Sequence, residues 1–376
     1  MTTATMRAAR MHNMGEPMLI EELPVPEPGP DEVRVAVQAC NVVPNLANVL
    51  RSWTTWFPHR PLPTLPAIFG LDPAGIVDAI GANVEGIQVG ERVYVNPGRV
   101  CNACRACRAG GLIACESYSF AGYFGLTANS HRVLDRYSGG LAEFMIAPHY
   151  SLVTLPNNVE FEAAARFGYL GTMYSALRKL APEPGSTLLV NGISGTLGIG
   201  AALLAPQLGV TRIYGTGRNR DLLDRVRSIC PSRIETHSLH DGPVEDWIAE
   251  RTGGRGVDMY IDALGTGAAH HTFLGGLRSL ARGGRAVNIG AITGEVPIDV
   301  HSLMGHQQSL IGSCWFTPSE GQAMAELAAV GGVDLSVFEH RRYPLDAVNQ
   351  AVSQADGNGA GGFANFVVCP QRTSTP

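Results

Sequence analysis

Four cysteines lie within fifteen residues of one another, and their spacing is typical of a metal site. They are Cys101, Cys104, Cys107 and Cys115. Four thiolate sulfurs this close can complete a tetrahedral shell around zinc, which leaves no position open for a substrate. In a reducing compartment, clustered cysteines indicate metal binding rather than disulfides. We therefore predict one structural zinc ion per chain, with free thiols as the alternative.

A glycine-rich turn between a predicted strand and a predicted helix indicates a dinucleotide site. An apolar strand over 187–190 precedes the turn, and a helix over 199–207 follows it. Glycines at this spacing let the backbone turn tightly and approach a pyrophosphate, which the N–H groups at a helix start can bind. The predicted cofactor-binding residues of the turn are Gly192, Ser194, Gly195, Thr196, Leu197 and Gly198.

The end of the next predicted strand indicates which nicotinamide cofactor binds. An NAD site usually places Asp or Glu there to hold the ribose hydroxyls, and here the position belongs to Gly217. Arg218 and Arg220 follow, and a guanidinium can bind a 2′-phosphate in a charge-assisted pair. We therefore predict NADP(H). The alternative is that both arginines are only solvated.

Two kinds of segment must position these residues. Alternating and β-branched residues over 33–40, and short strands bounded by glycine over 67–95, predict a mainly β unit up to about residue 168. From 170 to about 313, apolar strands alternate with helices, which predicts a parallel, doubly wound sheet. A helix over 320–329 and a strand over 363–368 are predicted for the remainder. The fold class is therefore α/β.

Composition and charge exclude several classes of protein. Hydrophobic residues make up 45% and charged residues 16%, which is typical of a folded globular chain. The net charge of −5 and the lack of a long basic run argue against nucleic acid as a partner. No stretch reaches the roughly 18 uncharged apolar residues that span a bilayer, and residues 1–22 lack the apolar core of a secretory signal. We expect a cytoplasmic protein without a membrane partner.

Taken together, these features resemble the medium-chain dehydrogenase/reductase superfamily over nearly the whole chain. The resemblance implies a β-rich, GroES-like catalytic domain of residues 1–168 and 314–376, and a Rossmann domain of residues 169–313, with substrate between them. It implies a homodimer formed through the Rossmann domain, with residues 295–310 near the partner. By the same resemblance, the residues around the nicotinamide are Thr172, Ala291, Ser313 and Trp315.

The alcohol dehydrogenases of this superfamily hold a second, catalytic zinc, and its ligands are missing here. The three ligand positions align with Val43, Leu71 and Gly168, and these residues offer no donor atom to a metal. Cys40, His59 and Asp72 form the alternative ligand set, although a shift of three residues along a strand points Cys40 to the opposite face. We predict that the structural zinc is kept and the catalytic zinc is lost.

The loss of a Lewis acid changes the expected reaction, because nothing then lowers the pKa of an alcohol hydroxyl. Zinc-free members of the superfamily, similar to quinone oxidoreductases and enone reductases, reduce conjugated acceptors with NADPH, and the turn after Asn191 resembles theirs. We predict direct hydride transfer to an activated C=C or C=O bond of an enone, enal, quinone or aromatic ketone. Two alternatives stay open: an alcohol dehydrogenase for secondary alcohols and ketones, and a nicotinamide-binding protein without catalysis.

Polar residues near the aligned ligand positions are the candidate catalytic residues. Asn45, Asn48 and Tyr169 can stabilise charge on a substrate oxygen, and Asp72 can act as an acid or an orienting group. The alternative for each is ordinary lining of the substrate site.

Two of the four tryptophans lie in a segment that we expect to be a loop, over 51–59. This loop is a candidate wall of a pocket for an apolar or aromatic small molecule; equally, it can anchor itself to the domain surface. We predict no role for the stretch 121–137.

Overall fold

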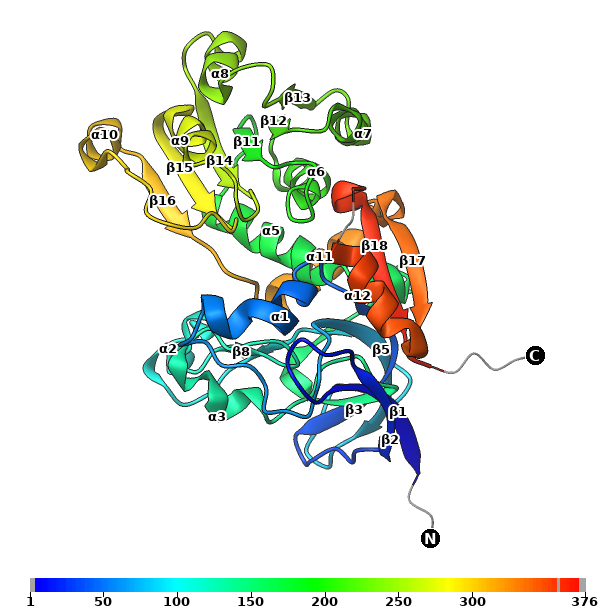
Figure 1. Ribbon diagram of the computed structural model, residues 1–376. Coiled ribbons are helices and arrows are strands. Elements are labelled where there is room, and N and C mark those ends of the chain that lie inside the picture. Colours follow the sequence, from blue (N-terminus) through cyan, green and yellow to red (C-terminus); the bar gives the residue numbers. More distant parts are fainter. Residues whose placement is uncertain (1–3, 357–358, 372–376) are drawn as a thin grey trace.

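The computed structural model describes residues 4–356 and 359–371, so the predicted domain limits at 1 and 376 lie outside the described residues. The chain forms a β-rich part and a part built on a parallel sheet, which meet around the long helix α5 (Phe167–Leu180) (Figure 1). No helix within the described residues is both long enough and apolar enough to cross a membrane.

The β-rich part is organised around the strand β3 (Glu32–Asn41), whose valines 33, 35 and 37 are buried. This alternation is the burial pattern expected of a strand with one face on the core. The main sheet has the order β10-β6-β5-β3-β18-β17, and β9 also pairs with β3. The strands of this part are β1 (Thr5–Met11), β2 (Leu19–Pro24), β4 (Ala67–Ile68), β5 (Asp72–Ile80), β6 (Arg92–Val95), β7 (Gly98–Arg99), β8 (Ser119–Phe120), β9 (Phe144–Pro148), β10 (Leu152–Thr154), β17 (Glu339–Pro344) and β18 (Ala364–Cys369).

A helix of eleven residues lies within the region predicted to be mainly β. The segment expected to be a loop over 51–59 was interpreted wrongly, because α1 (Leu46–Trp56) extends through most of it. Its buried side chains include those at positions i, i+3, i+4 and i+7, which are Leu46, Val49, Leu50 and Trp53. This is the pattern of an amphipathic helix. Figure 1 shows α1 on the side of the β-rich part that faces the parallel sheet.

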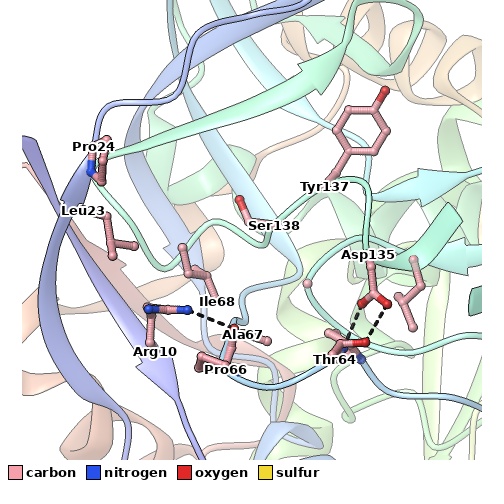
Figure 2. A pocket seen from close by; sticks show the side chains of 13 residues that line it. Arg10, Leu23, Pro24, Thr64, Pro66, Ala67, Ile68, Asp135, Tyr137 and Ser138 are labelled. Carbon is pink, nitrogen blue, oxygen red and sulfur yellow. Dashed lines mark hydrogen bonds between the residues drawn. The ribbon is translucent and has the colours of Figure 1, made fainter. Parts of the chain in front are cut away.

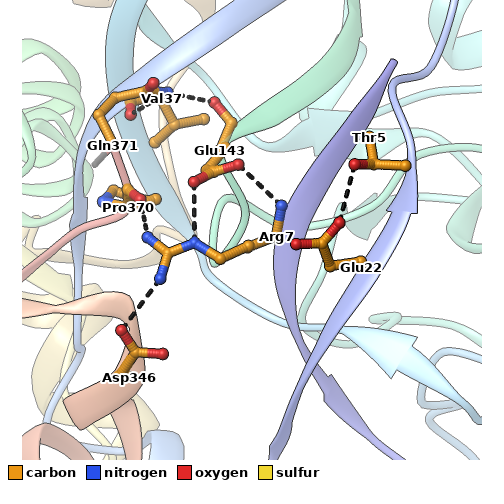
Figure 3. A network of polar contacts seen from close by, with 8 residues as sticks. All are labelled: Thr5, Arg7, Glu22, Val37, Glu143, Asp346, Pro370 and Gln371. Carbon is orange, nitrogen blue, oxygen red and sulfur yellow. Dashed lines mark hydrogen bonds and ion pairs between the residues drawn. The ribbon is translucent and has the colours of Figure 1, made fainter. Parts of the chain in front are cut away.

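The C-terminal segment returns to the β-rich part. Strand β18 lies antiparallel to β3, with Val368 opposite Cys40. Figure 3 shows the polar contacts that hold this return. Arg7 donates hydrogen bonds to Glu143 and to Asp346, each at 3.0 Å, and the Gln371 amide donates to two backbone carbonyls. Segments from both ends of the chain therefore belong to one folded unit.

The second part is a six-stranded parallel sheet in the order β13-β12-β11-β14-β15-β16. Numbered along the chain this is 3-2-1-4-5-6, the order of a Rossmann fold, so the predicted fold class is confirmed. Its strands are β11 (Thr187–Asn191), β12 (Arg212–Gly217), β13 (Ile234–Ser238), β14 (Val257–Asp262), β15 (Leu280–Asn288) and β16 (Ser309–Gly312). The remaining helices are α2 (Arg105–Arg108), α3 (His131–Leu134), α4 (Phe161–Ala164), α6 (Ile199–Leu204), α7 (Arg220–Ile229), α8 (Val244–Thr252), α9 (His270–Arg278), α10 (Val300–His306), α11 (Pro318–Ala329) and α12 (Val348–Asp356).

Candidate functional site

The four clustered cysteines converge on one point in the lobe between β7 and β8. Their sulfur atoms all lie within 4.8 Å of one another. Backbone N–H groups point at two of them: the Cys104 N–H donates to the sulfur of Cys101 at 3.3 Å, and the Ser117 N–H donates to that of Cys115 at 3.4 Å. Donors of this kind favour the thiolate, which is the form that binds a metal. The set fits a tetrahedral zinc ion.

The alternative zinc site of Cys40, His59 and Asp72 does not form. Among the described residues, the cysteine cluster is the only group of three or more metal-ligating side chains that come together. His59 is exposed just beyond α1, whereas Cys40 and Asp72 are fully buried at the β3–β5 pair.

The three aligned positions of the catalytic zinc ligands hold no metal-ligating side chain. Val43 and Leu71 are buried apolar side chains. At Gly168, near the start of α5, a Cβ atom would lie 2.2 Å from one carboxylate oxygen of Asp72 and 2.5 Å from the other. The Asp72 carboxyl group thus occupies the space that a side chain at position 168 would need.

The surroundings of Asp72 shift the pKa of its carboxyl group to near neutral pH. It accepts a hydrogen bond from the Tyr94 hydroxyl at 2.7 Å, and its second oxygen has no hydrogen-bond partner in the described part of the chain. Burial raises its pKa to about 7, although Tyr94 and the positive charge of Arg166 oppose the shift. Asp72 therefore changes protonation state within the physiological pH range.

Arg166 is a buried cation between this carboxyl group and the glycine-rich turn. Its Nη2 donates to the carbonyl oxygens of Thr196, at 3.2 Å, and Gly362, at 3.1 Å. Burial lowers its pKa to about 10, so it stays charged at neutral pH. Its guanidinium also lies over the ring of Tyr169, 5.1 Å from the centroid. One cation thus links the predicted catalytic residues Asp72 and Tyr169 to the predicted cofactor turn.

The two predicted asparagines lie at the start of α1. Near them lies a tyrosine that the sequence analysis did not select. The Asn48 amide donates to the Asn45 side-chain oxygen at 3.3 Å. Asn45 also lies near Tyr123, which belongs to the segment 121–137. Burial raises the pKa of Tyr123 well above its ordinary value, as do the nearby Tyr169 and Asp72, whereas Asn45 lowers it. The signal in the sequence was the dense run of aromatic residues and glycines over 118–125.

A row of four aromatic rings borders this group, and we call it the aromatic row: Trp53, Phe124, Phe120 and Trp315. Neighbouring ring centroids lie 3.9, 5.4 and 4.8 Å apart. Of the two tryptophans expected on a loop, only Trp53 joins it, because Trp56 is 51% exposed. The row connects α1 with the segment that follows β16.

The glycine-rich turn between β11 and α6 is tight and depends on glycine at two positions. Gly192 has a positive φ of 78°, and a Cβ at Gly198 would lie 2.1 Å from the Gly192 carbonyl oxygen. The backbone can therefore turn this tightly only with glycine at both places. The Gly362 N–H also donates to the Ser194 carbonyl at 2.8 Å, so the C-terminal segment supports the turn.

The two predicted phosphate-binding arginines differ in their surroundings. The buried last residue of β12 is Gly217, and because it is glycine no side chain projects there. Arg218 is exposed and forms no ion pair with any described residue. Arg220, in contrast, donates two hydrogen bonds to Asp241, one of them at 2.9 Å. Arg218 is the better placed of the two for an added phosphate.

The predicted nicotinamide contacts lie near the carboxyl ends of the strands and on α5. Thr172 donates to the Gly168 carbonyl at 2.8 Å. The backbone N–H groups of Ala291 and Ser313 already donate to carbonyl oxygens of the Rossmann part, which leaves their own carbonyl oxygens as acceptors. Trp315 has a positive φ of 62°, and its indole N–H donates to Asn96 at 3.0 Å.

A hollow of about 500 Å³ lies elsewhere on the β-rich part (Figure 2). It is lined by Arg10, Pro66, Tyr137 and their neighbours, and Asp135 in its wall accepts two hydrogen bonds from Thr64. None of the predicted site residues lines it. The segment 121–137 lines this hollow through Gly122, Leu134, Asp135 and Tyr137.

Comparisons with known proteins agree with this architecture. Residues 29–157 match the alcohol dehydrogenase GroES-like domain, and residues 196–329 match the zinc-binding dehydrogenase family. The chain is 26% identical to sorbitol dehydrogenase of Bacillus subtilis (strain 168), covering 93% of each chain, and 25% identical to quinone oxidoreductase of Homo sapiens, covering 95% of this chain and 96% of the relative. The solved structure of AibC superposes with a TM-score of 0.84 at 25% identity, covering 98% of this chain and 97% of that one.

The chain belongs to the medium-chain dehydrogenase/reductase superfamily, as the sequence predicted. It is an oxidoreductase of the zinc-binding dehydrogenase type.

Proposed function

We propose that this chain is an NADP(H)-dependent reductase of conjugated carbonyl compounds or quinones that works without a catalytic metal. The observation that carries the proposal is the Asp72 carboxyl group, which fills the side-chain space at Gly168, while Val43 and Leu71 occupy the other two ligand positions. The similarity to human quinone oxidoreductase supports it. The cysteine cluster would hold one structural zinc ion.

The residues fit a bound nicotinamide dinucleotide in three places. The turn 192–198 would hold the pyrophosphate, Arg218 the 2′-phosphate, and Thr172, with the backbone at Ala291, Ser313 and Trp315, the nicotinamide. When bound, the nicotinamide supplies the hydride. Substrate would then lie between the catalytic domain (residues 1–168 and 314–376) and the Rossmann domain (residues 169–313). The protein would be a cytoplasmic homodimer.

The chain's own contribution to such a reaction is orientation and charge stabilisation. When hydride adds to the carbon β to a carbonyl group, the electrons of the C=C bond move to the carbonyl oxygen, which needs hydrogen-bond donors. Asn45, Tyr169 and Asp72 in its protonated form are donors near the former metal position. The aromatic row gives this side of the candidate site an apolar lining, which suits a conjugated substrate.

Substrate profiling on zinc-quantified protein tests the proposal. Elemental analysis should give one zinc per chain, and NADPH oxidation should be fast with 2-enones, enals or quinones and slow with matched saturated ketones. Two zinc ions per chain, or equal rates with saturated ketones, would reject it.

A second candidate is an alcohol dehydrogenase acting between a secondary alcohol and a ketone, which the similarity to sorbitol dehydrogenase favours. Turnover of saturated ketones without turnover of enones would establish it. No turnover with any of these compounds, despite cofactor binding, would favour a nicotinamide-binding protein without catalysis.

A further inference from the structure

We propose that Arg166 is a positioning residue for the pyrophosphate of the cofactor: it orients one peptide group of the glycine-rich turn and places a buried positive charge behind that group. A short helical turn before β18 (Gly361–Phe363), which we call the C-terminal strap, fixes Arg166 against the turn. The inference rests on the proposed function only in taking the turn 192–198 to bind a nicotinamide dinucleotide.

Three consecutive backbone N–H groups of the turn are free to bind an anion. The Gly195 N–H donates to the Gly192 carbonyl at 2.9 Å, which closes the turn. Within the described residues, the N–H groups at positions 196–198 donate to no protein acceptor. Successive N–H groups of this kind form an anion-binding concavity. Residues 191–200 include no lysine or arginine, so positive charge at the turn has to come from elsewhere in the chain.

Arg166 fixes the direction of the peptide group between Thr196 and Leu197. Its Nη2 donates to the Thr196 carbonyl oxygen at 3.2 Å. In a trans peptide the C=O and N–H bonds point in opposite directions, so the Leu197 N–H points away from Arg166. Hydrogen bonds in a chain polarise one another, and the guanidinium therefore makes this N–H a stronger donor. The Leu197 N–H is thus aimed at an anion on the other side of the turn.

Arg166 carries a positive charge that no ion pair neutralises. Its side chain is 1% exposed and forms no ion pair with any carboxylate among the described residues. The rings of Tyr169 and Phe338 lie beside the guanidinium, with centroids at 5.1 and 4.9 Å. Burial lowers the pKa of Arg166 only to about 10, and Asp72, which acts on its charge, is only partly ionised near pH 7. A buried cation attracts an anion more strongly than an exposed cation does, so Arg166 supplies the charge that the turn lacks.

The C-terminal strap holds Arg166 and the turn together. The same Nη2 atom donates to the Gly362 carbonyl at 3.1 Å, and the Gly362 N–H donates to the Ser194 carbonyl at 2.8 Å. A Cβ at Gly362 would lie 2.4 Å from the Gly195 carbonyl oxygen, and a Cβ at Gly361 would lie 2.6 Å from that of Ser194. Because only glycine permits this approach, the backbone of the strap lies directly on the backbone of the turn.

The first test is Arg166→Met, which keeps a long side chain and removes the charge and the donors. We expect the Kd of the dinucleotide to rise by about 10- to 100-fold, the effect typical of a charge-assisted hydrogen bond. Arg166→Lys keeps the charge and should recover part of the lost affinity. Fluorescence titration measures Kd for NADPH or NADH, whichever the wild type binds more tightly. An unchanged Kd for Arg166→Met would overturn the inference.

A fragment without the pyrophosphate separates this role from general damage to the fold. The fragment is 2′-AMP where the wild type prefers NADPH, and adenosine where it prefers NADH. Calorimetric titration should give the same fragment Kd for the wild type and Arg166→Met. If the substitution weakens the fragment and the dinucleotide by the same factor, Arg166 has only a structural role and the inference is wrong.

The strap provides a second variant that leaves the guanidinium in place. Gly362→Ala should push the strap away from the turn and weaken dinucleotide binding without changing fragment binding. Gly359→Ala is the matched control, because nothing lies within 4 Å of its Cβ position. Equal dinucleotide Kd values for Gly362→Ala and the wild type would reject the role of the strap.

The binding readouts also separate this inference from the proposed function. Dinucleotide binding that depends on Arg166, in a protein that reduces no enone or quinone, would support the role of Arg166 and reject the proposed reduction. Enone reduction by the wild type, with a dinucleotide Kd that Arg166→Met leaves unchanged, would reject the role of Arg166 and leave the proposed function standing.

Discussion

At the scale of single residues, the candidate site places a buried carboxyl group, that of Asp72, beside a position that aligns with a ligand of the catalytic zinc. A first-row metal ion would bring positive charge, whereas Asp72 brings a group that is only partly ionised at neutral pH. The nearest compensating cation, Arg166, also binds the carbonyl of Thr196 in the cofactor turn. The electrostatic state of the site therefore depends on pH close to neutrality, through the ionisation of Asp72.

Replacing Asp72 with asparagine should change how the free energy of unfolding depends on pH. Because burial raises the pKa of Asp72 from 3.8 to about 7, the folded state favours the protonated carboxyl group. The protonated carboxyl group contributes its full stabilisation below the ordinary pKa of 3.8. This stabilisation is lost as the pH rises from there through about 7, at roughly 1.4 kcal/mol per pH unit. Urea denaturation at several pH values should show wild type losing stability relative to Asp72→Asn over this range. Parallel profiles would contradict the buried pKa.

Cofactor preference should depend on Arg218 more than on Arg220. A charge-assisted hydrogen bond contributes roughly 1.5–3 kcal/mol, so Arg218→Ala should weaken NADPH binding by about 10- to 100-fold and leave NADH binding nearly unchanged. Arg220→Ala is the comparison variant and should have a smaller effect, because Asp241 already engages that side chain. Fluorescence titration measures both constants. Equal weakening of NADPH and NADH would rule out phosphate binding by Arg218.

At the scale of elements, local patterns predicted most of the fold. The strands β3 and β11 and the helix α11 agree with their predicted ranges to within about two residues, because hydrophobic period and turn residues are local signals. Helix α1 was missed because the residues outside its apolar stripe include Asn48, Ser52 and two threonines, which have low helix propensity. The position of Tyr123 close to the candidate site was beyond sequence reasoning, because it depends on two glycines, 70 and 122, that meet only in the folded chain.

The packing of α5 against β5 predicts an unusual response to alanine. Gly→Ala within a helix usually stabilises a protein by up to about 1 kcal/mol. Gly168→Ala should instead destabilise it by about 1–3 kcal/mol, since the new methyl group would overlap the buried Asp72 carboxyl group. Gly305→Ala in α10 is the control, because nothing lies within 4 Å of its Cβ position. Thermal unfolding measures both, and a stabilised Gly168→Ala variant would show that this space is open.

At the scale of the whole molecule, one face of the Rossmann part exposes apolar side chains beside an open edge of the sheet. Val300 and Met304 are 73% and 60% exposed and lie one helical turn apart on α10. The edge strand β16 follows directly, and its outer side pairs with no other strand among the described residues. Exposed apolar side chains beside an open sheet edge are typical of an interface. We expect the homodimer to form here.

The double substitution Val300→Glu and Met304→Glu should therefore convert a dimer into a monomer. Two carboxylates per chain would meet their symmetry-related copies across a two-fold interface, and burying like charges is costly. Size-exclusion chromatography with light scattering should give about half the wild-type mass, while circular dichroism stays unchanged. Val330→Glu is the matched control, because Val330 is 82% exposed but follows α11, away from α10. If the double variant keeps the mass of a dimer, the interface lies on another face. If the wild type is itself a monomer, the predicted interface does not exist.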